Sequence, residues 1–253
     1  MTPTGIMPTG ITRTGVMLAA DEPLVRWDWV RDHTDEVWQR TVEHVQLTVY
    51  SLAIGFVVAG LLSVVAIKFR RTYGPITWVT GILYTIPSLA LIAPLAKWLG
   101  FGNAPVVIAL VTYTLLILIR NNVAAFDGVP PEVRDAATGM GYTPLRRVLQ
   151  VELPLALPVI IAGVRIASVT VIGLVTIGAL VGAGGYGAFI DDGLNRFFPT
   201  AVIVGTTLSV LLAVVVDLAF VLLERLLTPW RRMRRATAPL TATRLERLAG
   251  GVR

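Results

Sequence analysis

Five long apolar segments dominate this chain of 253 residues. They cover roughly residues 45–67, 76–96, 104–120, 156–182 and 200–223. Each is about long enough to cross a bilayer as a helix, which takes about 20 apolar residues. Hydrophobic residues make up 55% of the chain and charged residues 15%. The pattern predicts an all-α membrane protein with five transmembrane helices, and it argues against a soluble enzyme.

Polar segments flank the apolar ones. Residues 1–20 are rich in Thr, Gly and Pro, and we expect a disordered tail there. Residues 21–44 mix both charge signs with three tryptophans, which suits an external amphipathic helix at the membrane interface. Residues 45–228 form the predicted transmembrane domain, and residues 229–253 form a basic cytoplasmic tail.

The basic residues predict the orientation of the chain. If the first span runs inward, most of the 22 Lys and Arg residues lie on the cytoplasmic side. The positive-inside bias therefore predicts an external N-terminus and a cytoplasmic C-terminus. The net charge of +6 then faces lipid head groups, so we expect membrane lipids as partners and no nucleic acid.

The sequence lacks the residues that most catalytic and metal sites need. There is no Cys, and His33 and His44 are the only histidines, so we expect no metal site. A Walker phosphate loop needs Gly-Lys-Ser/Thr, but neither Lys68 nor Lys97 follows a glycine. Hydrolase signatures of the Gly-x-Ser-x-Gly and His-Glu-x-x-His types are absent as well. The chain is therefore predicted to perform no chemistry and to bind no cofactor, with energy supplied by a partner chain.

The connector from Asn121 to Leu155 is the longest internal one and has helical character. Pro131 suits the first position of a helix, and Gly141 permits a tight bend after it. A second short helix can begin with Thr143 as its cap and Pro144 as its first residue. We expect a helix, a bend and a second helix at the cytoplasmic surface.

The same connector carries a spaced motif. An acidic residue and two alanines are followed after three residues by Gly, and after nine more by an aliphatic residue, one further residue and Leu-Pro. The matching residues are Asp135, Ala136, Ala137, Gly141, Val151, Leu153 and Pro154. This motif resembles the cytoplasmic loop of permease subunits of ATP-binding-cassette importers, with Asp in place of Glu, which shortens the reach of the acid.

Further stretches narrow the resemblance. They are Ile86–Ala90, Arg120–Asn122, Glu152–Pro158 and Gly182–Gly187. Over roughly residues 40–228 the chain resembles the permeases that import glycine betaine, choline, carnitine and related osmoprotectants. The resemblance implies the fold of a type I importer permease with a cytoplasmic coupling helix. Two alternatives stay open, namely a permease of the same class for an amino acid or an anion, and a membrane scaffold or channel without an ATPase.

The resemblance also implies partners. They are ATPase subunits that bind ATP and Mg, a second permease chain that is identical or paralogous, and an external substrate-binding protein, all at the bacterial inner membrane. In the family the loop docks on the ATPase, and small residues there permit close approach. The residues expected to couple to the ATPase are Glu132, Asp135, Ala136, Ala137, Gly141, Tyr142, Leu153 and Pro154.

Two groups within the spans are candidates for the transport pathway. Aromatic faces recognise quaternary ammonium groups, although helix packing explains the tyrosines equally well. The expected lining is Tyr84, Thr85, Pro87, Ser88, Thr112 and Tyr113. Arg165 and Asp217 lie at similar depth in two spans, and an unpaired charge there is costly. We expect the two to face each other or a wet cavity, and the alternative is that each snorkels separately.

Overall fold

The computed structural model describes residues 23–229, in which all regular elements are helical and the long helices pack into one bundle. The predicted tail 1–20 and the basic residues 230–253 lie outside the described residues. The helices are α2 (Trp27–Asp32), α3 (Thr34–Lys68), α4 (Tyr73–Thr85), α5 (Ser88–Leu99), α6 (Asn103–Asp127), α7 (Pro131–Gly139), α8 (Pro144–Arg147), α9 (Leu153–Val175), α10 (Gly187–Asn195) and α11 (Pro199–Leu227). Short 3-10 helices, η1 (Arg70–Thr72) and η3 (Thr176–Val181), and a π-helical turn, η2 (Val148–Glu152), join them.

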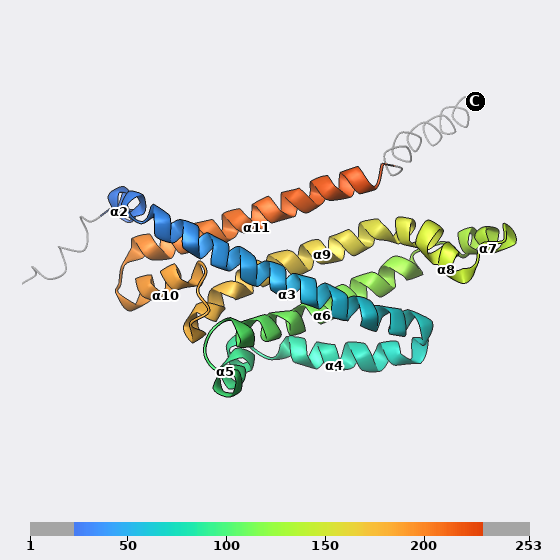
Figure 1. Cartoon of the computed structure of the whole chain (residues 1–253), viewed down its shortest axis with the longest axis horizontal. Helices are drawn as coiled ribbons and strands as arrows, with labels where there is room; N and C mark the ends of the chain where they lie inside the picture. Colours follow the sequence, from blue (N-terminus) through green and yellow to red (C-terminus); the bar gives the residue numbers. More distant parts are fainter. Residues whose placement is uncertain (1–22, 230–253) are drawn as a thin grey trace, which may run out of the picture.

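Helix α6 forms the centre of the bundle. It packs against α3, α4, α5 and α9, and half of its most apolar stretch is buried. Both hydrophobic clusters combine side chains of α3, α6 and α9. Helix α11 packs on α9 and α10 and leaves most of its apolar surface exposed, as a lipid-facing helix does. Figure 1 shows α7 and α8 at one end of the long axis, and α2 and α10 at the opposite end.

The second predicted span, 76–96, is not one straight helix. Its two parts, Arg70–Thr85 and Ser88–Leu99, meet at 90°. Pro87 has no backbone N–H, and it forces the preceding Ile86 into an extended conformation with φ −66° and ψ 128°. Within residues 23–229, four helical segments are long and apolar enough to cross a membrane, and the count reaches five only if the bent pair is one span.

Two further boundaries differ from the sequence prediction. Residues 34–44 do not form a separate interfacial helix, because α3 continues from Thr34 to Lys68 without a break. No Gly or Pro interrupts that stretch before Gly55, so nothing local ends the helix. The third span likewise continues to Asp127, which shortens the connector that follows it.

Candidate functional site

The loop between α6 and α9, here called the α7–α8 loop (residues 128–152), has the predicted form. Helix α7 begins at Pro131, and α8 begins at Pro144 after Thr143. The Thr143 side chain caps α8 by accepting a hydrogen bond from the Arg146 amide at 3.4 Å. Gly141 turns the chain between the helices with φ +81°, a conformation that costs other residues about 1 kcal/mol or more. The predicted helix, bend and second helix are thus confirmed.

The predicted coupling residues do not share one surface. Glu132, Asp135, Ala136 and Gly141 are exposed, and Tyr142, Leu153 and Pro154 are half-buried. Ala137 is fully buried, so the expectation that both alanines present a small surface to a partner is wrong for this residue. At about 100° per residue, Ala137 lies on the side of α7 that packs on the chain, whereas Asp135 and Ala136 lie on the exposed side. Only Ala136 of the pair is open to a partner.

A buried carboxylate, Glu152, holds the two arms of the loop. Its side chain is 7% exposed, and its oxygens lie 2.8 Å from Nε of Arg147 and 3.4 Å from Nε of Arg134. Arg134 also donates to the backbone oxygen of Phe126, near the end of α6. Arg147 also donates to the hydroxyl of Thr138 at 3.1 Å. The sequence prediction missed this cluster, and its only local signal is an acidic residue directly before the Leu-Pro that opens an apolar span.

The predicted pathway residues gather around the bend between α4 and α5. The rings of Tyr84 and Tyr113 meet edge to face, with centroids 5.9 Å apart. The Tyr113 hydroxyl donates to the carbonyl oxygen of Ile86 at 2.5 Å. The chain is extended at Ile86, so its carbonyl does not continue the helical hydrogen bonds of α4, and the tyrosine supplies a partner for it. The remaining members are Thr85 and Pro87, which are exposed, and Ser88 and Thr112, which are half-buried.

Arg165 and Asp217 form a two-pronged ion pair between α9 and α11. Nε of Arg165 lies 2.8 Å from Oδ1 of Asp217, and Nη2 lies 2.9 Å from Oδ2. The side chains are 29% and 35% exposed. The planar fork of arginine matches a carboxylate in this geometry, which fixes orientation as well as charge. The structure thus brings the two residues face to face, as one of the two sequence hypotheses requires.

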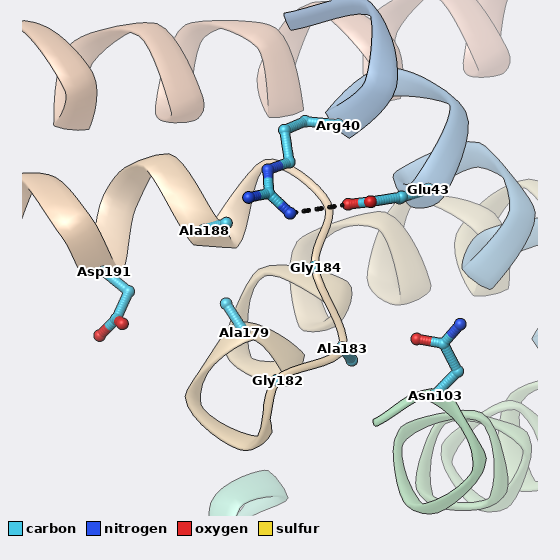
Figure 2. A pocket seen from close by; sticks show the side chains of 9 residues that line it. All are labelled: Arg40, Glu43, Asn103, Ala179, Gly182, Ala183, Gly184, Ala188 and Asp191. Atoms are coloured by element: carbon cyan, nitrogen blue, oxygen red, sulfur yellow. Dashed lines mark hydrogen bonds and ion pairs between the residues drawn. The ribbon is translucent and has the colours of Figure 1, made fainter. Parts of the chain in front are cut away.

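At the opposite end, residues 182–187, here called the glycine loop, pack against α3. The loop joins η3 to α10, and Figure 2 shows it beside Arg40 and Glu43. Oε2 of Glu43 accepts hydrogen bonds from the amide of Gly185 at 2.9 Å and from Nη1 of Arg40 at 3.1 Å. A Cβ on Gly184 would lie 2.3 Å from the same oxygen, so a side chain there would push the Glu43 carboxylate aside, and its φ of +75° also favours glycine. A cavity of about 330 Å³ opens between these charges, Asn103 of α6 and α10.

His44 lies beside Glu43 and is fully buried. Its Nδ1 accepts a hydrogen bond from the amide of Tyr186 at 3.2 Å, so Nε2 carries the proton and donates to the Ile172 carbonyl at 3.1 Å. One imidazole thereby joins α3, α9 and the glycine loop. The sequence analysis considered His44 only as a metal ligand. Among residues 23–229, no group of three His, Asp or Glu side chains is placed to hold a metal ion.

Comparisons with known proteins agree with this architecture. Residues 51–241 match the family described as "Binding-protein-dependent transport system inner membrane component". The choline transport system permease protein OpuBB of Bacillus subtilis (strain 168) is 37% identical over 194 residues, covering 77% of this chain and 89% of the relative. The osmoprotectant import permease protein OsmW of Salmonella typhimurium is 34% identical over 206 residues, covering 79% and 96%.

A solved structure shows the same fold. A chain of the MetNI methionine ABC transporter in an inward-facing conformation aligns with a TM-score of 0.68 at 24% identity, covering 76% of this chain and 96% of that chain. These matches confirm the resemblance and the all-α fold class of a type I importer permease. The chain belongs to the family of binding-protein-dependent transport system inner membrane components, and it is a multi-pass membrane permease of the ATP-binding-cassette importer class.

Proposed function

We propose that this chain is the translocation subunit of an importer for quaternary-amine osmoprotectants such as choline, glycine betaine or carnitine. The cargo assignment rests on sequence identity: the chain is 32–37% identical to permeases named for choline, glycine betaine and carnitine transport, over about three quarters of its length. The chain carries no phosphate-binding motif of its own. ATP and Mg therefore bind to separate ATPase subunits in this proposal.

The α7–α8 loop is the part of this chain that docks on the ATPase. Its exposed residues include Glu132, Asp135 and Ala136 on α7, and it projects from one end of the bundle (Figure 1). This end carries Arg70, Arg146 and Arg147, which supports a cytoplasmic location by the positive-inside bias. The glycine loop and α10 then face outward, toward the substrate-binding protein. A second permease chain, identical or paralogous, completes the pathway.

The bend between α4 and α5 is the best candidate for substrate contact. The α4 helix ends at Thr85, and a helix C-terminus carries a partial negative charge. The exposed ring of Tyr84 lies beside that end, and an aromatic face attracts the methyl groups of a quaternary ammonium. Tyr113 is buried and bonded to Ile86, so its role is to hold the bend. A weak site of this kind lets the substrate pass.

The test is uptake of labelled choline, glycine betaine and carnitine at high osmolarity. The host cells lack their own osmoprotectant importers and carry this gene with its neighbouring genes. We expect saturable uptake of at least one of the three compounds. Absence of uptake for all three, together with uptake of a labelled amino acid or anion, contradicts the cargo assignment.

A matched pair of variants tests the role of the loop. Gly141→Val places a branched residue at φ +81°, whereas Gly60→Val adds atoms where a Cβ meets nothing within 4 Å. We expect Gly141→Val to abolish uptake while its amount in the membrane stays normal, and Gly60→Val to transport like the parent. Equal transport by the two variants contradicts the coupling role of the bend.

A further inference from the structure

We propose that Glu152 is a positioning residue that clamps the α7–α8 loop to the start of α9, so that the loop and α9 move as one rigid body. The inference rests on the proposed function, because the loop must be pushed by an ATPase for the clamp to matter. Glu152 is buried and therefore lies outside the exposed surface that is proposed to dock on the ATPase.

The burial of Glu152 is the first observation. A carboxylate with 7% exposure is tolerated only when charges pair with it, and removal of one partner of such a pair is strongly destabilising. Here the two cations come from different arms of the loop, Arg134 from α7 and Arg147 from α8. Arg147 lies on the same continuous helix as Glu152, so the ion pair with Arg134, together with the bond from Arg147 to Thr138, ties α7 to the start of α9.

The backbone is adapted to this contact. In an α-helix, residues five apart point about 140° away from each other, at 3.6 residues per turn. The π-helical turn η2 (Val148–Glu152) widens the helix between Arg147 and Glu152, so that residues five apart come to the same side. Pro154 supplies the reason, because it cannot donate to the carbonyl of Gln150 and its ring crowds that carbonyl. The Leu-Pro part of the motif thus produces the turn that lets the clamp close.

The clamp also reaches α6 and, through α9, the rest of the bundle. Arg134 bonds to Phe126 near the C-terminal end of α6, where the helix carbonyls are electronegative. From Pro144 to Val181 the chain is one continuous helical rod. That rod is tied to α11 by Arg165 and Asp217, and to α3 by the bond between Ile172 and His44. A displacement of the loop is thereby carried along α9 to both neighbours.

The first experiment measures distance in the assembled complex. The chain has no cysteine, so spin labels on Met140→Cys in the loop and Val159→Cys on α9, both exposed, report a single distance when only one of the two permease chains of the complex carries them. With Glu152 present, we expect that distance to stay the same when ATP and Mg are added. With Glu152→Gln, we expect a broader distribution that shifts on ATP addition. A narrow, ATP-independent distance in both proteins overturns the clamp, whatever the cargo is.

The second experiment measures uptake per ATP hydrolysed in proteoliposomes. We expect Glu152→Gln to lower this ratio at least tenfold, with assembly intact and basal hydrolysis within twofold of the parent. Glu152→Asp keeps the charge and should recover part of the ratio. The matched control is Asp127→Asn, which removes an exposed ion pair with Arg70 of 2.8 Å at the same end and should leave the ratio unchanged.

If the complex with Glu152→Gln does not assemble, Arg147→Gln is used instead. It removes the ion pair between Arg147 and Glu152 at a half-exposed side chain, and it should lower the uptake per ATP hydrolysed in the same way. A parental ratio in Glu152→Gln, or in both Arg147→Gln and Arg134→Gln, overturns the clamp. Absence of osmoprotectant uptake by the parent complex overturns the proposed cargo instead, and the distance experiment still decides on the clamp.

Discussion

The two ends of the bundle are held together in different ways. At one end, the α7–α8 loop is fixed by charges around Glu152, and a Cβ on Gly139 or Gly141 would meet nothing within 4 Å. At the other end, the glycine loop is held by hydrogen bonds to Glu43 and His44 and also by close packing, because Gly187 leaves no room for a Cβ. Charged contacts let a loop stay exposed for a partner and still be rigid. Close packing holds a loop in place but leaves little of it free to move.

The largest expected effect is at Gly187. A Cβ there would lie 2.0 Å from the carbonyl oxygen of Thr176, a backbone atom that cannot turn away. We expect Gly187→Ala to lower the free energy of unfolding by about 3 kcal/mol, the upper range for overpacking. Thermal unfolding in detergent measures it. Gly139→Ala, at the other end, is the control and should leave Tm unchanged or slightly raised. Equal Tm values would contradict the contrast between the ends.

The two histidines give the next test. His44→Ala leaves the Tyr186 amide and the Ile172 carbonyl without their partner, and we expect a loss of about 2 kcal/mol. His33 stacks on Trp29 near the surface, so His33→Ala should cost much less. The measurement is again thermal unfolding. A larger loss for His33→Ala would show that the buried imidazole does not hold the glycine loop.

The adjacent alanines of α7 separate stability from docking. Ala137→Leu overpacks a buried position and should cost about 1.5 kcal/mol in unfolding free energy. Ala136→Leu is exposed and should leave Tm unchanged, but it should reduce copurification of the ATPase subunit, because the surface is no longer small. Full copurification with Ala136→Leu would remove Ala136 from the docking surface.

The smallest expected effect concerns the ion pair that joins α9 to α11 between the two ends. Arg165→Met leaves Asp217 without its partner, and we expect a lower Tm. The double variant Arg165→Met with Asp217→Leu should regain most of the loss, since two apolar side chains suit this partly exposed site. If the double variant has a lower Tm than Arg165→Met alone, the ion pair contributes more than the neutralisation of two charges.

Local signals in the sequence predicted much of this structure. Pro131, Gly141 and Thr143 each act within one helical turn, and the structure places the helix starts and the bend at these residues. The clamp and the glycine loop were not predictable, because their contacts join distant residues. Glu43 and Gly185, for example, are 142 positions apart. Ala137 was misjudged since neighbouring residues on a helix look alike in sequence but face different surroundings.

The elbow between α4 and α5 has a consequence for how the molecule can move. Its extended conformation is imposed by Pro87, and the carbonyl that a straight helix would use is already occupied by Tyr113. Straightening would break that bond, and Pro87 would still have no N–H to donate to the carbonyl of Leu83. The bend between α4 and α5 is therefore expected to keep its angle and not to act as a hinge. Since α4 and α5 both pack on α6, we expect the three helices to tilt together when the transport path opens and closes.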